Sequence, residues 1–569
     1  GILSELTNLV RASQNITSLQ RSSVQALSVT VHPSNGEMLL FPWKRGKNEL
    51  VSEFNESLQV FESVRQTVWN CFNEFDWLQC LVEIYNSEED SNLTKVSVLR
   101  VILQMVRVAR DAMDQVLPHK AAMGLLLSLV RSEDNVICSL SLQILTHLLK
   151  QLSASRRKIE LDIDSDSILE KFERNYSHNE GQLLGMSVCC FLAEVVQAAN
   201  LKNYESMLKK FTTSHTLRQL AEFLAVKTYN RQEELKRVEG SGYGCVFMGF
   251  LDGPVLLLQR LLGKFISLGM QTEFIEAVKD SGVHEVLVVT VNSLNPRSEL
   301  SPKGLVSLLT FVHDAIFSEL KPLLQKMIQE GCIRTLSGLL KEAQLQSINE
   351  WPVMCGGGPN AVGLIIAQIL RIFNLPYTIQ SFYKEMELFN REFAICDIVT
   401  TTLHTMKYLS KEHLSIALSL LARMVLTTDG AKPFAQQFMH SGGMNIVSKY
   451  NLLSSENPSY LIVDTLSLIS QLARLSKDNY ESIHSSNIYQ SLKKLIDHSD
   501  SAVRSKVCNL IGNICRHSSF FYDLLMDHGL IQAAINCCRD PDRNTRKFAC
   551  FAVGNAGFHN SKLYEVLRP

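Results

Sequence analysis

Apolar residues recur along most of the chain every three or four positions, in segments long enough for helices and separated by short polar turns. The clearest case is "VRSKVCNLIGNICRH" from Val503, which predicts a long amphipathic helix. A short helical pattern, "SSFFYDLLMDHG", follows it and ends at Gly529, where a left-handed cap is expected. The same junction of a glycine with a new apolar segment recurs at Gly282, Gly331 and Gly442. This alternation of short and long helices predicts an all-α fold.

The segment "TRKFACFAVGNAGFH" from Thr545 repeats the pattern of the segment from Val503. Arg504 aligns with Arg546, Gly512-Asn513 with Gly554-Asn555, and His517 with His559, each pair being 42 residues apart. One further step back the match weakens, and Gln471 replaces the asparagine. Helical repeats of about this length are typical of armadillo and HEAT proteins, so we predict a superhelical solenoid of armadillo or HEAT type.

Breaks in the helical pattern divide the chain into five expected segments. A polar segment is followed by a first array of helical repeats, glycine-linked middle repeats, further middle helical repeats, and C-terminal armadillo repeats with the 42-residue period. Their bounds are 1–50, 51–237, 238–355, 356–440 and 441–569. The sequence begins with Gly1 instead of methionine, and we expect it to be a piece of a longer polypeptide.

Composition excludes several classes of partner and site. A net charge of −1 gives no overall attraction to nucleic acid or to an anionic membrane, so neither is expected as a partner. The most apolar stretch, around 364–370, is interrupted by Gln368 and followed by Arg371, and no membrane span is predicted. The 14 cysteines lack the spacing of a disulfide framework or a metal site.

Motifs that would carry chemistry are incomplete. The glycines at 240, 242 and 244 miss the spacing of a nucleotide-binding loop and favour a connection between repeats. Asp162, Asp164, Asp166 and Glu173 match ligand positions of a calcium loop, but Ser167 replaces its required glycine, so helix capping is favoured. We therefore expect no catalytic residue, metal or cofactor in this stretch of chain. A histidine such as His517 is expected to be a structural hydrogen-bonding residue.

Binding chemistry is the remaining interpretation. The long third helix of an armadillo unit lines a concave groove, where an asparagine amide can both donate to and accept from the backbone of an extended ligand. The predicted groove residues are Asn513, Asn555, Arg504, Arg516, Arg543, Arg546 and Lys547. Their positive charge favours an acidic or phosphorylated segment of a partner protein. Alternatively, the charges solvate exposed helix faces and the asparagine caps a local kink. Gly554 is expected to permit close approach of a neighbouring helix.

The amino-acid sequence of the last repeats shows a more specific resemblance to a known family. The Gly-Asn pair in "VCNLIGNI" and "ACFAVGNA" resembles the armadillo pattern, in which that asparagine is a ladder residue for peptide backbone. The C-terminal stretch of about 70 residues, including "CRDPDRNTRKFACFAVGNAGFHN", resembles the C-terminal armadillo region of the Fused family of serine/threonine kinases. By that resemblance only Asn513 and Asn555 carry over as ladder residues, and Gln471 departs from the pattern.

The resemblance implies a non-catalytic docking scaffold that lies C-terminal to a protein kinase domain. ATP and Mg²⁺ are then expected only in that kinase domain, outside this sequence. Family partners are kinesin-like proteins and Hedgehog-pathway components. Family members act in the central pair of motile cilia and in microtubule-based cell division, which implies a cytoplasmic protein at a cilium, axoneme or other microtubule structure. The alternative is an unrelated armadillo adaptor with a structural role in the axoneme.

Overall fold

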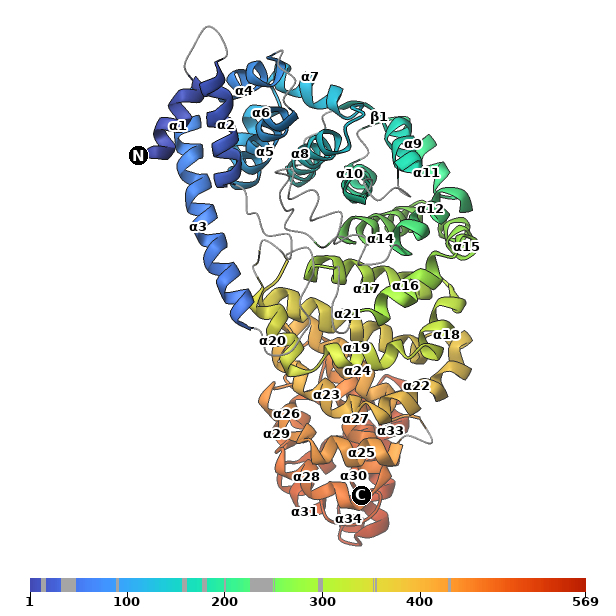
Figure 1. Ribbon diagram of the computed structural model, residues 1–569. Coiled ribbons are helices and arrows are strands. Elements are labelled where there is room, and N and C mark those ends of the chain that lie inside the picture. The colour runs from blue at the N-terminus through green and yellow to red at the C-terminus, as the bar shows by residue number, and fades with distance from the viewer. Residues whose placement is uncertain are drawn as a thin grey trace. The chain divides into compact units, whose positions relative to one another are not determined.

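The structure is a computed structural model of the 569-residue chain (Figure 1). It describes all residues except 12–16, 32–47, 88–91, 156–160, 176–181, 199–200, 226–248, 250, 295–299, 352, 354–355, 428–430 and 569. The glycine-rich stretch with glycines 240, 242 and 244 lies outside the described residues.

The chain forms two compact units. Unit 1 comprises Gly1–Thr335 with Glu342–Ile365, and unit 2 comprises Leu336–Lys341 with Ile366–Pro569. The division falls within α19 (Cys332–Leu339) and within α21 (Pro359–Thr378). The predicted segment boundaries stay predictions.

Unit 1 is built on a row of long helices, each packed on the next. In chain order they are α2 (Ser18–Val31), α5 (Asn92–Val108), α8 (Asn135–Ala154), α10 (Gln182–Ala198), α14 (Asp252–Ser267) and α17 (Pro302–Phe317). Their apolar residues form a continuous buried core, in which α8 and α10 contribute most of their described length. Such a row of mutually packed helices is the expected core of a solenoid.

Shorter helices flank this row. They are α1 (Ile2–Arg11), α4 (Trp77–Asn86), α6 (Arg110–Val116), α7 (Lys120–Leu129), α9 (Ser165–Asn175), α11 (Tyr204–Lys210), α12 (Ser214–Ala225), α15 (Gln271–Ser281), α16 (Val283–Asn292), α18 (Lys321–Gln329) and α20 (Glu342–Glu350). The 25-residue helix α3 (Asn48–Phe72) contacts both α1 and α20 (Figure 1). The segment predicted as polar, 1–50, thus begins with the two helices α1 and α2.

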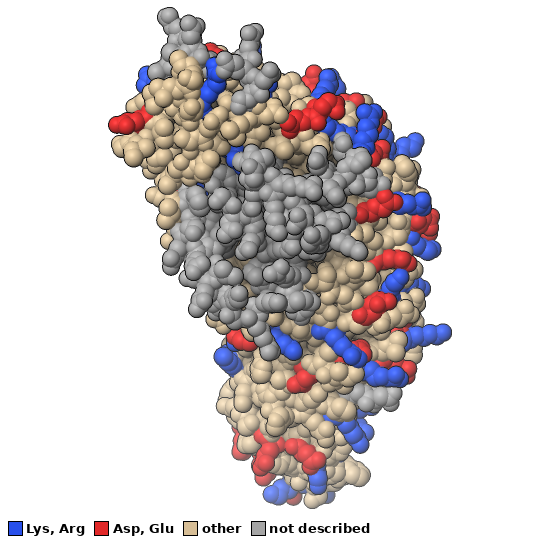
Figure 2. Space-filling model, in the orientation of Figure 1, with Lys and Arg blue, Asp and Glu red and all other residues tan. Residues whose placement is uncertain are grey.

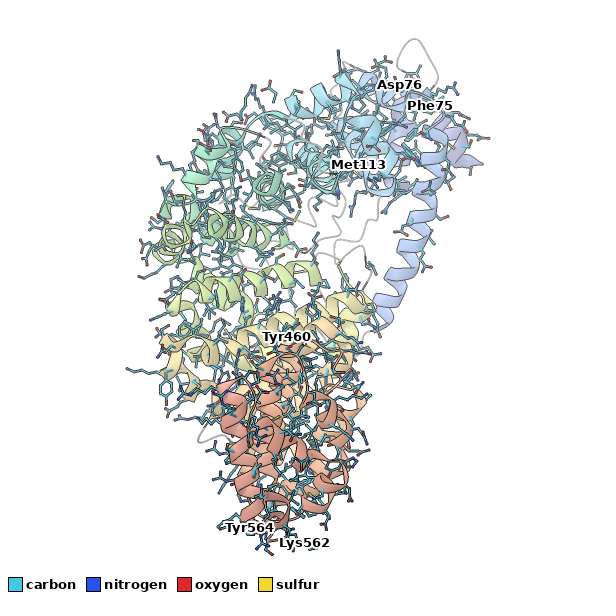
Figure 3. The ribbon with its side chains drawn as sticks, turned by 180° about the vertical axis from the view of Figure 1, so that it is seen from behind. Phe75, Asp76, Met113, Tyr460, Lys562 and Tyr564 are labelled. Atoms are coloured by element: carbon cyan, nitrogen blue, oxygen red, sulfur yellow. The ribbon has the colours of Figure 1, made fainter. Side chains whose placement is uncertain are left out.

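At the N-terminal end of unit 1, a polar turn joins α3 to α4. Figure 3 labels Phe75 and Asp76 of this turn and Met113 of α6 nearby. The guanidinium of Arg11 lies 5.5 Å from the centre of the Phe75 ring. Asp76 accepts a hydrogen bond from the backbone N–H of Gln79 and so caps α4. These contacts join α1 to α4 at the end of the row.

The aspartates that match calcium-loop positions lie in a strand and a helix. Asp162 belongs to β1 (Leu161–Asp164), which pairs in parallel with β2 (Leu201–Lys202) and leads directly into α9. Asp162 forms an ion pair with Lys202, and Asp166 lies 3.2 Å from the ammonium of Lys210. Figure 2 shows such interspersed acidic and basic side chains along the edge that carries α9 to α18. Asp162 and Asp166 therefore pair with lysines, and Asp164 accepts a hydrogen bond from the Asn203 side chain, instead of facing a shared loop centre.

The prediction that no segment is long and apolar enough to cross a membrane is wrong for helix α21. Among the described residues it is the one helix long and apolar enough, with a mean hydropathy of 1.4 in its most apolar window. However, 78% of that window is buried inside the protein. Core helices of globular proteins pass the same test, so length and composition alone are weak support for a span.

A buried carboxylate joins two long helices of unit 1. Asp252, at the start of α14, accepts hydrogen bonds from the backbone N–H of Ser301 at 2.9 Å and of Gly249 at 3.0 Å. The Ser301 hydroxyl donates to it at 2.5 Å and caps α17 through the N–H of Gly304. A Cβ on Gly304 would lie only 1.9 Å from the Asp252 carboxylate, so this position requires glycine.

We expect Asp252→Asn to change the pH dependence of stability. Burial raises the pKa of Asp252 to about 6, although the hydrogen bonds from Ser301 and Gly249 lower it. Because the folded-state pKa exceeds the unfolded value, the native protein binds this proton more tightly between about pH 4 and pH 6. As the pH rises from about 4 to about 6, the free energy of unfolding should therefore fall by on the order of 1 kcal/mol per pH unit. Asp252→Asn should lack this pH-dependent fall. Urea denaturation at several pH values compares the two, and parallel curves would contradict the expectation.

Unit 2 repeats the pattern of long and short helices. The long helices, each packed on the next, are α24 (Lys411–Met424), α27 (Ser459–Leu475), α30 (Ser501–Ile514) and α33 (Arg543–His559). The short ones are η4 (Gln380–Phe382), α22 (Tyr383–Ile395), α23 (Ile398–Thr405), η5 (Met406–Tyr408), α25 (Ala431–His440), α26 (Gly443–Lys449), η6 (Lys477–Asn479), α28 (Tyr480–Ser485), α29 (Tyr489–Leu495), α31 (Tyr522–Asp527), α32 (Leu530–Cys537) and α34 (Leu563–Leu567). Tyr460 lies on α27, and Lys562 and Tyr564 lie at the α34 end (Figure 3).

The predicted glycine junctions are confirmed. Gly282, Gly331, Gly442 and Gly529 all have positive φ angles, between 69° and 80°. A residue without a Cβ adopts this left-handed conformation at little cost, which lets one helix end and the next begin at once. The all-α solenoid predicted from the sequence is therefore the observed fold, with the β1–β2 pair as the strands among the described residues.

Candidate functional site

The predicted site residues lie on α30 and α33, two long helices of unit 2 that pack on each other. Both helices begin at an aspartate cap. Asp500 accepts from the N–H of Ala502 at 2.9 Å, and Asp542 accepts from the N–H of Thr545 at 2.7 Å. Since these caps are 42 residues apart, they start the two helices at equivalent positions and place the two Gly-Asn pairs at the same level.

The two asparagines connect successive helices. The side-chain amide of Asn513 donates to the Ser470 hydroxyl of α27 at 2.7 Å and to the Asn509 side chain at 3.1 Å. The amide of Asn555 donates to the backbone carbonyl of Gly512 on α30 at 2.8 Å. Each asparagine thus reaches back one repeat. Asn555 is half-buried, whereas Asn513 is only 3% exposed, so its side chain does not face the surface as predicted.

Arg504, predicted to line the groove, holds the repeats together instead. Its Nε and Nη2 donate to the two carboxylate oxygens of Asp540 at 2.8 and 3.0 Å. Its Nη1 donates to the backbone carbonyls of His498 and Ser499 at 2.8 and 3.0 Å. Asp540 belongs to the turn before α33, so this ion pair crosses from one repeat to the next. The hydrogen bond from Arg504 holds the pKa of Asp540 below its usual value.

Arg546 makes the equivalent contacts within its own repeat. Its Nη1 donates to the backbone carbonyls of Asp540 at 2.7 Å and Pro541 at 2.8 Å. These carbonyls lie 42 residues after those that Arg504 contacts. Arg504 does not supply free positive charge to a groove as predicted, because its guanidinium is already paired with the Asp540 carboxylate. Arg546 bonds to two backbone carbonyls and pairs with no carboxylate among the described residues, so its part in a groove stays a prediction.

The remaining predicted cations, Arg516, Arg543 and Lys547, are exposed. The backbone carbonyl of Arg516 lies 2.9 Å from the His559 Nε2, and that of Arg474 lies 2.9 Å from the His517 Nε2. Both contacts span one repeat, which confirms that His517 is a structural hydrogen-bonding residue. Binding of a partner by the three exposed cations stays a prediction.

The glycines of the two Gly-Asn pairs differ. A Cβ on Gly512 would lie 2.4 Å from ring atoms of Phe551 and 3.2 Å from the Cα of Ala552. A Cβ on Gly554 would meet no atom within 4 Å. Gly512, and not Gly554 as predicted, is therefore the glycine that permits close approach of helices.

Sequence reasoning missed polar residues on the earlier helices of unit 2. Asn374 of α21 donates to the Ile416 carbonyl of α24 at 3.2 Å, and Arg423 of α24 donates to the Asn374 side chain at 3.0 Å. Burial raises the pKa of Asp464 on α27, while Arg423 and Lys506 on either side lower it. An asparagine late in an apolar helix, as in "ILRIFNL", was the available signal for Asn374.

Together these residues form a row, with one polar residue on each of α21, α24, α27, α30 and α33. We call it the polar row, and its members are Asn374, Arg423, Gln471, Asn513 and Asn555. The last two are linked to the preceding helix through Ser470 and Gly512, the neighbours of Gln471 and Asn513. Gln471 and Asn555 are the half-buried amides of this row, and such amides can donate and accept hydrogen bonds, as recognition of an extended backbone requires.

Comparison with known sequences gives two partial similarities. Mouse serine/threonine-protein kinase 36 is 24% identical over 295 residues, which cover 46% of this chain and 22% of that kinase. Serine/threonine-protein kinase TIO of Arabidopsis thaliana is 29% identical over 107 residues, covering 19% of this chain and 8% of that kinase. No protein-family model matches the sequence. The chain thus spans less than a quarter of either relative's length.

Comparison with solved structures supports the fold. A structure from work on a phosphorylation switch that controls the interaction between cadherin and β-catenin has a TM-score of 0.52 at 10% identity, covering 98% of this chain and 96% of the other. A computationally designed armadillo repeat protein for modular peptide recognition covers 48% of this chain at 18% identity, with a TM-score of 0.36. The first likeness extends over nearly the whole chain, in agreement with a helical solenoid.

Proposed function

We propose that this chain is the non-catalytic armadillo scaffold region of a Fused-like serine/threonine kinase, and that it binds protein partners along the polar row of unit 2. Partial similarity to two serine/threonine kinases supports the kinase connection. The helical solenoid supports the scaffold role, because stacked repeats present an extended surface to a partner. The assignment to the Fused family depends on the sequence motifs of the last repeats.

The observation that carries the proposal is the geometry of Asn555. Its amide nitrogen is fixed by the Gly512 carbonyl at 2.8 Å, which orients the half-buried side chain on α33. A held amide loses little further conformational freedom when it bonds to a ligand. The exposed Arg543 and Lys547 on the same helix, with Arg516 after α30, favour an acidic segment.

The partners proposed are kinesin-like, Hedgehog-pathway or axonemal proteins, in the cytoplasm at a cilium or another microtubule structure. ATP and Mg²⁺ would then belong to a kinase domain elsewhere in the full-length protein. Sequencing the full-length transcript tests this part of the proposal. A transcript that encodes this chain without a kinase domain would contradict it.

We expect Asn555→Ala to weaken binding of such a partner about tenfold, the effect of losing roughly one to two hydrogen bonds at an interface. The measurement is the dissociation constant of the 569-residue chain for purified kinesin-like and Hedgehog-pathway candidates. Asn513→Ala is unsuitable because Asn513 is buried and its loss would also unlink α30 from α27.

Gln532→Ala is the matched control, since Gln532 is exposed on the short helix α32 and, among the described residues, its side chain bonds only to Asn536 one turn away. If Gln532→Ala weakens binding and Asn555→Ala does not, the partner contacts the short-helix side. That outcome favours the alternative of an axonemal adaptor held by its flank.

A further inference from the structure

A second cluster of charge lies in unit 1, on the successive long helices α8, α10, α14 and α17. The ammonium of Lys150 on α8 lies 3.9 Å from the carboxylate of Glu194 on α10, and Glu194 is only 4% exposed. One turn later on α10, Gln197 accepts a hydrogen bond from the guanidinium of Arg260 on α14. Two cations from different helices thus approach the same face of α10.

The buried contacts around Asp252 place Lys303 of α17 near this face of α10. The backbone N–H of Ser301 donates to the Asp252 carboxylate, which places the start of α17 beside the start of α14. Gly253 packs so closely on α10 that a Cβ there would lie 2.9 Å from the Cys190 sulfur. Cys190 is one turn before Glu194. Lys303, two residues after Ser301, therefore lies near Glu194, and its side chain is exposed.

The charges at this face do not balance. Asp252 is already used by Ser301 and Gly249, which leaves Glu194, 3.9 Å from Lys150, as the carboxylate that also acts on Lys303. Although the Lys303 side chain reaches the surface, its partly buried ammonium has a lowered pKa. Lys150 and Arg260 lower that pKa further, while Glu194 and Asp252 raise it.

Two further observations agree with an excess of positive charge. The pKa of His147, one turn before Lys150 on α8, is held well below its usual value by burial and then by Arg107, Lys150 and Lys303. The Nε of Arg260 is buried and has no hydrogen-bond partner among the described residues. Like charges held together in partly buried surroundings repel strongly, and an added anion relieves that repulsion.

We propose that Lys150, Arg260 and Lys303 form a binding site for the phosphate group of a phosphorylated segment of a partner protein. A phosphate group carries nearly two negative charges and three acceptor oxygens, which suit two ammonium groups and a guanidinium. A carboxylate carries one charge, and Glu194 already provides one. This site lies in unit 1 and is independent of the polar row, so it extends the proposed scaffold function with a contact that phosphorylation controls.

The test measures binding of the 569-residue chain to three probes. They are a degenerate peptide pool with a fixed phosphoserine, the same pool with glutamate in its place, and inorganic phosphate. We expect the phosphoserine pool to bind at least about tenfold more tightly than the glutamate pool, because charge-assisted bonds to phosphate are stronger. Equal affinity for both pools would overturn the phosphate assignment. Binding of inorganic phosphate with no gain from the peptide would overturn the protein segment as its source.

Variants of Lys303 assign the binding to this site. Lys303→Ala should weaken binding of the phosphoserine pool about tenfold, whereas Lys303→Arg, which keeps the charge, should restore most of it. The matched control is Lys279→Ala, an exposed lysine on the short helix α15 of the same unit. Lys150 is left intact because its removal would leave Glu194 buried without its cation.

Unfolding of each variant by heat reports whether the fold is kept. If Lys303→Ala keeps the fold and still binds the phosphoserine pool as the unmodified chain does, the proposal is wrong. Asn555→Ala should leave this binding unchanged, which separates the failure of this site from a failure of the polar row.

Discussion

Replacement of Arg504 with alanine should lower the free energy of unfolding of unit 2 by about 3 kcal/mol, because it removes four charge-assisted hydrogen bonds and leaves Asp540 without its cation. The side chains of the pair are only 16% and 9% exposed. Urea denaturation, with hydrogen exchange of the α30 and α33 amides, measures the loss.

Two comparisons make this prediction specific. Arg543→Ala removes an exposed arginine of the same region and should change stability by less than about 0.5 kcal/mol. Arg546→Ala removes hydrogen bonds to two carbonyls but no ion pair among the described residues, and should lower the stability by an intermediate amount. Equal effects of Arg504→Ala and Arg543→Ala would show that the link between repeats does not stabilise the unit.

The difference in stability between the unmodified chain and Arg504→Ala should also depend on pH, in a definite direction. Arg504 lowers the pKa of Asp540 in the folded protein. The stability that follows from this shift is present above the unfolded-state pKa and is lost as pH falls through the folded-state value. The difference in stability between the unmodified chain and Arg504→Ala should therefore shrink in acid, below about pH 4.

Alanine substitutions at the two equivalent glycines should have opposite effects. Gly512→Ala places a methyl group 2.4 Å from the Phe551 ring and 3.2 Å from the Ala552 backbone, and should destabilise unit 2 by about 2 kcal/mol. Gly554→Ala adds a methyl group in open space within a helix and should stabilise it by about 0.5 to 1 kcal/mol.

The two variants control for each other, because the residue type and the position within the repeat are the same on α30 and α33. Denaturation midpoints of both, compared with the unmodified chain, give the sign directly. If both variants are stabilised, Phe551 moves aside freely and the close approach at Gly512 is not a constraint.

The sequence allowed the fold to be predicted because helical period, glycine caps and the 42-residue repeat are local or repeated signals. The role of Arg504 could not be predicted in that way. Its partner Asp540 lies in the turn before the next repeat, and an arginine that recurs in each repeat to bind a ligand has the same sequence signal as one that pairs with a turn. Arg504 and Arg546 were therefore assigned to a ligand, when their guanidiniums bond to backbone carbonyls at equivalent positions.

The burial of individual side chains was the second property that could not be predicted from residue type. Asn513 and Asn555 occupy the same position in the repeat, yet one is buried and the other half-buried. Asp252 belongs to no recognisable sequence motif, because its partner Gly249 lies close to it along the chain and its partner Ser301 lies far from it. Such sites depend on which helix packs beside a residue, and only the assembled fold determines that.

The hydrogen bonds between successive long helices also determine the mechanical character of unit 2. Asn513, Asn555, His517 and His559 each contact a group one repeat back, at separations of 43 residues. Sliding one repeat past the next would break several of these bonds at once, so shear between repeats is resisted more strongly than apolar packing alone would resist it. The spacing between Asn513 and Asn555 is consequently held by hydrogen bonds on both helices, and the proposed partner would have to match that spacing.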